Sequence, residues 1–155
     1  MVSVAYFDTS ALIKYYVTES GSPWVRALLD GPAAPVMVTS RLTLIEMTCA
    51  LARRLRDSTL LPDQHRRVTN LINHDVHSRY DVMDVTPTAI ETAQQLANRR
   101  PLRAYDAVQL AAAWLTNREL LRVGRPALMF LSADDRLLAI AQAEGLLTDN
   151  PNFHP

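Results

Sequence analysis

Short apolar runs alternate with longer amphipathic stretches along the whole chain of 155 residues. The runs are rich in β-branched and aromatic residues and only a few residues long, which is typical of buried strands. The first of them, VSVAYF, ends abruptly at an aspartate. Strands are therefore predicted over Val2–Phe7, Val36–Thr39, Tyr80–Val85, Ala127–Ser132 and Leu146–Thr148.

The stretches between these runs carry signals for the start and end of helices. Ser40 and Thr86-Pro87 have the residue types of helix N-caps, and Ser22-Pro23 offers the same pairing of a cap with a first-turn proline. Gly31 and Gly145 follow the last periodic residues of their segments, where a helix stops. Helices are predicted over about Ser10–Tyr16, Pro23–Asp30, Arg41–Asp57, Pro62–His77, Pro87–Asn98, Leu102–Asn117 and Asp134–Glu144.

Strands that alternate with helices predict an α/β fold, in which one short parallel sheet of about four or five strands has helices on both faces. No internal repeat, low-complexity segment or long linker divides the sequence. We therefore expect a single domain over residues 1–149, followed by a loose C-terminal tail over residues 150–155.

Composition narrows the class of protein only slightly. Acidic and basic residues balance at 16 each, so the net charge does not point to a nucleic-acid partner. Cys49 is the only cysteine. It excludes an intrachain disulfide and a cysteine-rich zinc site, and its apolar helix suggests an inert core residue. The sequence shows neither a charged leader nor an apolar run of about 18 residues, so we expect a cytoplasmic protein without a membrane partner.

The positions of four acidic residues carry more information. Each lies in, or directly next to, a run that otherwise has the character of protein core. An unpaired buried carboxylate costs several kcal/mol, and none of these runs contains an arginine or lysine to compensate it. A shared divalent cation would neutralise several carboxylates at once. The four residues are Asp8, Glu46, Asp106 and Asp134.

The predicted fold would bring these acids together. Asp8 and Asp134 follow strands, and in open α/β sheets the ligand crevice lies outside the carboxyl ends of the strands. Glu46 is expected in the second turn of its helix, and Asp106 in the first turn of another, where the helix dipole favours a negative charge. Because only oxygen ligands are offered, Mg²⁺ or Mn²⁺ is the natural occupant.

Each acid also has a purely structural interpretation. Asp8 and Asp134 are suited to cap the helices that follow them. Glu46 would then face solvent on an amphipathic helix, and Asp106 would only complement its helix dipole. The convergence of all four on one crevice of one predicted fold favours the metal site.

Four segments resemble the motif regions of the PIN-domain family, and more narrowly the VapC-type toxin ribonucleases of type II toxin–antitoxin systems. They are FDTSALIKYY, LTLIEMTCALARR, LRAYDAVQLAAA and FLSADDRLLAIAQAEGL. The resemblance covers essentially the whole chain, with the segments in order and at ordinary spacing. It implies a single PIN-like domain, an endoribonuclease that depends on Mg²⁺ or Mn²⁺, an RNA substrate, a cognate antitoxin protein as partner and a homodimer.

The resemblance also implies roles for individual residues. The family's metal-binding acids fall on the four carboxylates named above, with Asp135 as the alternative to Asp134. The hydroxyl residue that assists the site falls on Thr9 or Ser10, and Ser132 has a similar role. One or two ions would bind the scissile phosphate, lower the pKa of a bound water and stabilise the departing 3′ oxygen.

Arginines just before Asp106 are the best-placed candidates to bind a substrate phosphate. They are Arg99, Arg100 and Arg103. His74 and His77 stand three residues apart, but no third metal ligand is near them in the sequence, which indicates solvated helix residues.

Two other functions are open. A haloacid-dehalogenase-like phosphatase would use Asp8 as nucleophile, but that chemistry needs a second acid two residues later, where Ser10 stands. A catalytically silent PIN module would only bind protein or RNA, and the intact set of four acids argues against it.

Overall fold

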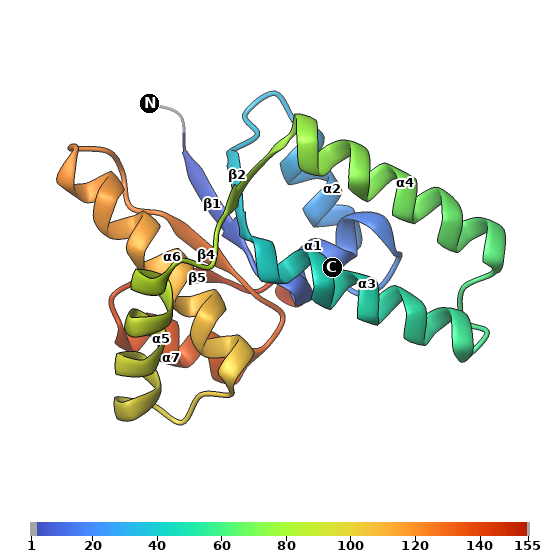
Figure 1. Ribbon diagram of the computed structural model, residues 1–155. Coiled ribbons are helices and arrows are strands. Elements are labelled where there is room, and N and C mark those ends of the chain that lie inside the picture. Colours follow the sequence, from blue (N-terminus) through green and yellow to red (C-terminus); the bar gives the residue numbers. More distant parts are fainter. Residues whose placement is uncertain (1–2, 155) are drawn as a thin grey trace.

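A five-stranded parallel sheet forms the centre of the protein, and the computed structural model describes it within residues 3–154 (Figure 1). The strand order is β3-β2-β1-β4-β5, so the first strand lies in the middle. The elements are β1 (Val4–Phe7), α1 (Thr9–Tyr16), α2 (Ser22–Asp30), β2 (Val36–Ser40), α3 (Arg41–Arg56), α4 (Pro62–Ser78), β3 (Tyr80–Met83), α5 (Pro87–Arg99), α6 (Ala104–Arg122), β4 (Met129–Leu131), α7 (Asp135–Ala143), β5 (Leu147–Asp149) and a 3-10 turn, η1 (Pro151–Phe153).

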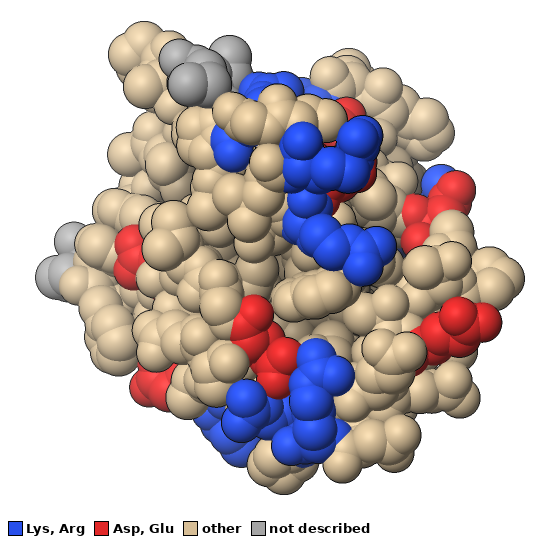
Figure 2. All heavy atoms as spheres, turned by 90° about the vertical axis from the view of Figure 1, so that its left-hand side faces the viewer, with Lys and Arg blue, Asp and Glu red and all other residues tan. Residues whose placement is uncertain are grey.

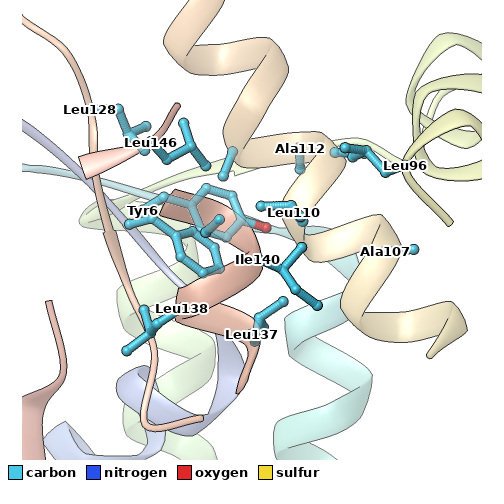
Figure 3. Packing of buried hydrophobic residues seen from close by; sticks show 14 of the residues in the cluster. Tyr6, Leu96, Ala107, Leu110, Ala112, Leu128, Leu137, Leu138, Ile140 and Leu146 are labelled. Atoms are coloured by element: carbon cyan, nitrogen blue, oxygen red, sulfur yellow. The ribbon is translucent and has the colours of Figure 1, made fainter. Parts of the chain in front are cut away.

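The central strand is buried on both faces and therefore contributes to two cores. Val4 and Tyr6 pack with side chains of α5, α6 and α7, whereas Ala5 and Phe7 pack with side chains of α1 to α4. Alternate residues of a strand point to opposite faces, which explains why VAYF is apolar throughout. Figure 3 shows Tyr6 among the side chains of α6 and α7, with its hydroxyl oxygen directed towards α6. The predicted α/β fold is confirmed.

Several element boundaries differ from those expected. The third strand ends at Met83, where its pairing with β2 ends opposite Ser40. The sixth helix continues five residues beyond Asn117 to Arg122, through a segment of good helix formers. Ser22 is the first residue of α2 rather than its cap, because Gly21 takes the N-cap position with φ of 79°. Val2 lies outside the described residues.

The C-terminal segment is packed against the domain up to His154, although the sequence suggested a loose tail. Asn150 is buried and its side chain accepts a hydrogen bond from the backbone of Asn152. The ring of His154 stacks on Trp24, with 4.2 Å between the centroids. Gly21 allows this packing, because a Cβ there would lie 2.3 Å from the carbonyl oxygen of Pro151. None of the helices in residues 3–154 is long and apolar enough to cross a membrane.

Candidate active site

A cleft with a volume of about 620 Å³ opens where β1 and β4 end, between α1, α3 and the first turn of α6. Its size lies within the range of about 300 to 1,000 Å³ that is typical of ligand sites. Four acids line it, two from helices α3 and α6 and two from the N-caps of helices α1 and α7, and the sequence predicted that they converge. They are Asp8, Glu46, Asp106 and Asp134.

Asp8 is the most deeply held of these acids. It follows β1 directly and caps α1 by accepting a hydrogen bond from the backbone N–H of Ala11 at 2.9 Å. The hydroxyls of Ser10 and Ser132 donate to its two oxygens at 2.7 and 2.6 Å. Burial raises the pKa of Asp8 to about 6, although these three hydrogen bonds favour the charged form and oppose the shift. A cation next to this carboxylate would stabilise its charged form and so offset the free-energy cost of burying it.

Glu46 lies in the second turn of α3 and is held by two side chains from elsewhere in the fold. Thr9 donates to its Oε1 from α1 at 2.9 Å, and Gln109 donates to the same oxygen from α6 at 2.7 Å. Gln109 is itself fixed, because the hydroxyl of Tyr6 donates to its Oε1 at 2.6 Å. The other carboxylate oxygen of Glu46, Oε2, has no hydrogen-bond partner among the described residues.

Gln109 is the residue that the sequence analysis missed. It is buried on α6, where it connects β1, α3 and α6 through its amide. A signal was present, because Gln109 follows Asp106 by three residues and therefore lies on the same side of the helix. It is also the only amide in the otherwise apolar stretch AVQLAAAWL.

Asp106 and Asp134 are held less firmly than Asp8. Asp134 caps α7 by accepting hydrogen bonds from the backbone of Arg136 and Leu137. The carboxylate of Asp106 accepts no hydrogen bond within residues 3–154, and Arg136 approaches it only to 3.6 Å. Partial burial, followed by the charge of Asp134, raises the pKa of Asp106.

The residues expected to support the site divide into two groups. Thr9, Ser10 and Ser132 all contact its acids, and Ser10 also accepts a hydrogen bond from the backbone of Ala133. Asp135, in contrast, is exposed, does not line the cleft, and accepts a hydrogen bond from Asn150 at 2.6 Å. Of the two neighbouring aspartates, the structure brings Asp134 into the cleft.

The donor set of the cleft is chemically suited to a hard cation. All four acids offer carboxylate oxygens, which Mg²⁺ and Mn²⁺ prefer. The pKa values of Asp8 and Asp106 are raised by burial and by neighbouring acids, which is the condition that a bound cation relieves. As the side chains stand, no three His, Cys, Asp or Glu residues between positions 3 and 154 are close enough together to hold one ion.

Only one of the three arginines expected to bind RNA lines the cleft. Arg103 does so, whereas Arg99 and Arg100 each form an ion pair with Glu144 at 2.7 Å. Arg53 of α3 lines the cleft as well, although the sequence gave no reason to separate it from its neighbours. On the face shown in Figure 2, Lys and Arg side chains form two separate groups with mostly uncharged surface between them. This face therefore offers no continuous basic track.

Two further expectations concerned Cys49 and the histidines of α4. Cys49 is exposed and lines the cleft, so its assignment to the core was wrong. The buried stripe of α3 consists of Thr43, Met47 and Leu51, and Cys49 lies outside that stripe. His74 and His77 are exposed residues of α4, as expected.

Fold and cleft together define an α/β protein with a carboxylate-lined cleft at the carboxyl ends of a parallel sheet. The family model of the PIN domain matches residues 5–143. A curated relative, Ribonuclease VapC45 of Mycobacterium tuberculosis (strain CDC 1551 / Oshkosh), is 36% identical over 146 residues, which cover 92% of each chain. The chain belongs to the PIN domain family.

Solved structures show the same fold at lower sequence identity. A toxin–antitoxin complex from Klebsiella pneumoniae aligns with a TM-score of 0.58 and 20% identity, covering 95% of this chain and 97% of that chain. VapBC2 from Rickettsia felis, bound to a DNA fragment from its promoter, aligns with a TM-score of 0.65 and 10% identity, covering 95% and 98%. Family membership overturns the phosphatase alternative that was based on Asp8.

Proposed function

We propose that this chain is an endoribonuclease that depends on Mg²⁺ or Mn²⁺ and hydrolyses phosphodiester bonds of RNA. The observation that carries the proposal is the convergence on one cleft of four acids that are far apart in the sequence, with Asp8 buried beneath it. The relative from Mycobacterium tuberculosis is a ribonuclease by name, and its 36% identity extends over nearly the whole chain.

In this proposal the acids have different roles. Asp8 and Asp106 would hold the ion, and Asp134 would complete the ligand set. When bound, the ion supplies positive charge for the scissile phosphate, lowers the pKa of a water and stabilises the departing 3′ oxygen. The chain contributes placement and charge, and no covalent nucleophile is required.

Glu46 is assigned a role as the residue that orients the attacking water. Its Oε1 is held by Thr9 and Gln109, so the carboxylate cannot rotate freely. Its Oε2 has no partner among the described residues and is available to accept a proton from water. A fixed carboxylate with one available oxygen is suited to position a small nucleophile.

The metal requirement is tested with purified protein and a single-stranded RNA. EDTA should abolish cleavage, and Mg²⁺ or Mn²⁺ should restore it. Calcium should restore little, because its looser coordination geometry is poorly suited to this chemistry. Asp106→Asn serves as the matched inactive variant. Undiminished cleavage by the chelated protein would overturn the metal requirement, and equal cleavage by the variant would overturn the assignment of the site.

We further propose that the nuclease is the toxin of a toxin–antitoxin pair, with a cognate antitoxin that binds and inhibits it. The VapC name of the relative and the toxin–antitoxin complex that shares the fold support this role. Expression of the wild-type chain alone should arrest growth, and expression of Asp106→Asn should not. A harmless wild-type chain with proven nuclease activity would overturn the toxin role and leave the nuclease intact.

A silent module that only binds protein or RNA is the alternative, and the same experiments exclude or establish it. The pairing into homodimers implied by the resemblance stays a prediction, which sedimentation of the purified protein tests.

A further inference from the structure

Tyr105 differs from the other tyrosines of the protein. The hydroxyls of Tyr6, Tyr15, Tyr16 and Tyr80 all take part in hydrogen bonds with other side chains. Tyr105 has no hydrogen bond and no ring contact among residues 3–154. It is 61% exposed, yet it lies in the first turn of α6, next to Asp106, and lines the cleft. Neither packing nor hydrogen bonding within the domain accounts for this ring.

Two arginines of the cleft are similarly without hydrogen bonds. The side chains of Arg53 and Arg103 form no hydrogen bond or ion pair with any described residue, although the charge of Arg103 opposes the rise in the pKa of Asp106. Arg99 and Arg100, only a few positions before Arg103, are both engaged by Glu144. A guanidinium that forms no hydrogen bond or ion pair in a cleft has donors available to bind an oxyanion, and these planar donors match a phosphate.

The remaining surface of the cleft is partly apolar. Ile13 of α1 and Ile45 and Ala50 of α3 line it together with the ring of Tyr105 from α6. Ile45 is 55% exposed, so part of this apolar surface is open to solvent. Aromatic and apolar surface next to guanidinium groups is the combination that binds an unpaired nucleotide, because the base stacks while the phosphate is neutralised.

We propose that Tyr105, Arg53 and Arg103 form a nucleotide subsite of the cleft, in which Tyr105 is the residue that stacks on an unpaired base. A base of the substrate stacks on the Tyr105 ring, and the two arginines bind phosphates beside the acids. In a duplex each base is already stacked between its neighbours, so the ring has no free base to contact. The proposal rests on the proposed ribonuclease function and names the residues that bind one nucleotide of its substrate.

Binding is measured apart from cleavage by placing all variants in an Asp8→Asn background. The probe is a fluorescent single-stranded oligoribonucleotide, and its duplex is the competitor. Tyr105→Ala should weaken binding about 10-fold, since base–aromatic stacking contributes about 1 to 3 kcal/mol per base. Tyr105→Phe and Tyr105→Trp should bind like the parent, because stacking needs the ring and not the hydroxyl. Phe153→Ala is the control, since Phe153 is 69% exposed but lies outside the cleft.

The arginines are tested by the salt dependence of the same binding reaction. Each of Arg53→Ala and Arg103→Ala should weaken binding and reduce the slope of log K against log salt by about 0.7, as expected for one lost phosphate contact on a single strand. Arg56→Ala is the matched control, because Arg56 is an exposed arginine of α3 outside the cleft.

The outcomes separate this subsite from the function on which it rests. If the wild-type chain cleaves RNA but Tyr105→Ala binds the oligoribonucleotide as tightly as the parent, the subsite alone is overturned. Equal binding of the duplex and the single strand would overturn it as well. A parent-like slope for both arginine variants would also overturn it. If the wild-type chain neither binds nor cleaves RNA, the subsite and the ribonuclease function both fall.

Discussion

The two sides of the cleft are built differently. The inner side, formed by Asp8, Glu46 and Gln109, is bound together by hydrogen bonds from β1, α1, α3 and α6. The first turn of α6, with Tyr105 and Asp106, has no side-chain hydrogen bond to the rest of the described domain. The inner side is therefore preorganised before any ligand binds. The side chains in the first turn of α6 have hydrogen-bonding groups that are available to a metal or a substrate.

This difference indicates which residues of the cleft contribute to the stability of the fold and which contribute only to function. Fixed hydrogen bonds hold catalytic groups in a productive geometry, but they also tie those groups to the stability of the fold. Replacing a group that has no hydrogen-bond partner changes the stability of the fold little, although it removes a contact to the ligand. Substitutions on the two sides should therefore have different signatures.

The largest effect is expected for the activity of Asp8→Asn. This variant should lose more than about 100-fold in activity, which is the upper loss for replacing a residue that only hydrogen-bonds to a metal ligand. The larger loss is expected because Asp8 itself is proposed to bind the ion. RNA cleavage at saturating Mg²⁺ measures it. Asp63→Asn is the control and should retain full activity, because Asp63 is an exposed residue of α4 outside the cleft. Activity of Asp8→Asn within a few-fold of wild type would contradict the proposed role.

The pH dependence of the metal-free protein should come next in size. The pKa of Asp8 is raised from 3.8 to about 6, so the folded protein binds this proton more tightly than the unfolded chain. The contribution of Asp8 to the free energy of unfolding is therefore greatest below pH about 4, falls as the pH rises to about 6, and is constant above that. Between the low-pH and high-pH limits this contribution changes by about 3 kcal/mol. Urea unfolding in EDTA measures it, and Asp8→Asn should remove this part of the slope. An unchanged slope in the variant would exclude Asp8 as its source.

Gln109→Ala should impair both activity and stability. It leaves the buried hydroxyl of Tyr6 and the Oε1 of Glu46 without the amide that binds them, at a cost of about 1 to 3 kcal/mol. Activity should fall about 10- to 100-fold through misplacement of Glu46. Thermal melts and kcat measure the two effects, and the exposed Gln142→Ala on α7 is the control. Normal activity in a destabilised Gln109→Ala would show that the amide only supports the core.

The smallest effect is expected for the stability of Asp106→Asn without metal. No hydrogen bond is lost, and relief of the repulsion from Asp134 offsets the loss of the half-exposed 3.6 Å ion pair with Arg136. The free energy of unfolding should therefore stay within about 0.5 kcal/mol of wild type or rise slightly. Asp75→Ala is the contrasting variant. Asp75 is buried and accepts a hydrogen bond from Tyr16 at 2.8 Å, so this variant should lose about 1 to 3 kcal/mol. Equal losses in both would mean that Asp106 is also structural.

The sequence by itself determined the short parallel sheet with helices on both faces, and it placed Asp8 and Asp134 directly after strands of that sheet. These features follow from local information, because a short apolar run forms a buried strand in any parallel sheet and the residue after it lies at the carboxyl edge. Caps such as Ser40 and Thr86 depend on their own side chains and the next turn of backbone, so they too could be identified without a structure.

Only the tertiary structure decided which neighbours these residues meet. Arg99 and Arg100 donate hydrogen bonds to Glu144, which is more than forty residues away in the sequence, and neither lines the cleft. Gln109 joins Tyr6 and Glu46 from positions 103 and 63 residues distant. Periodicity specifies that a helix has a buried face, but the packing of distant elements determines which side chains line a cleft and which satisfy one another.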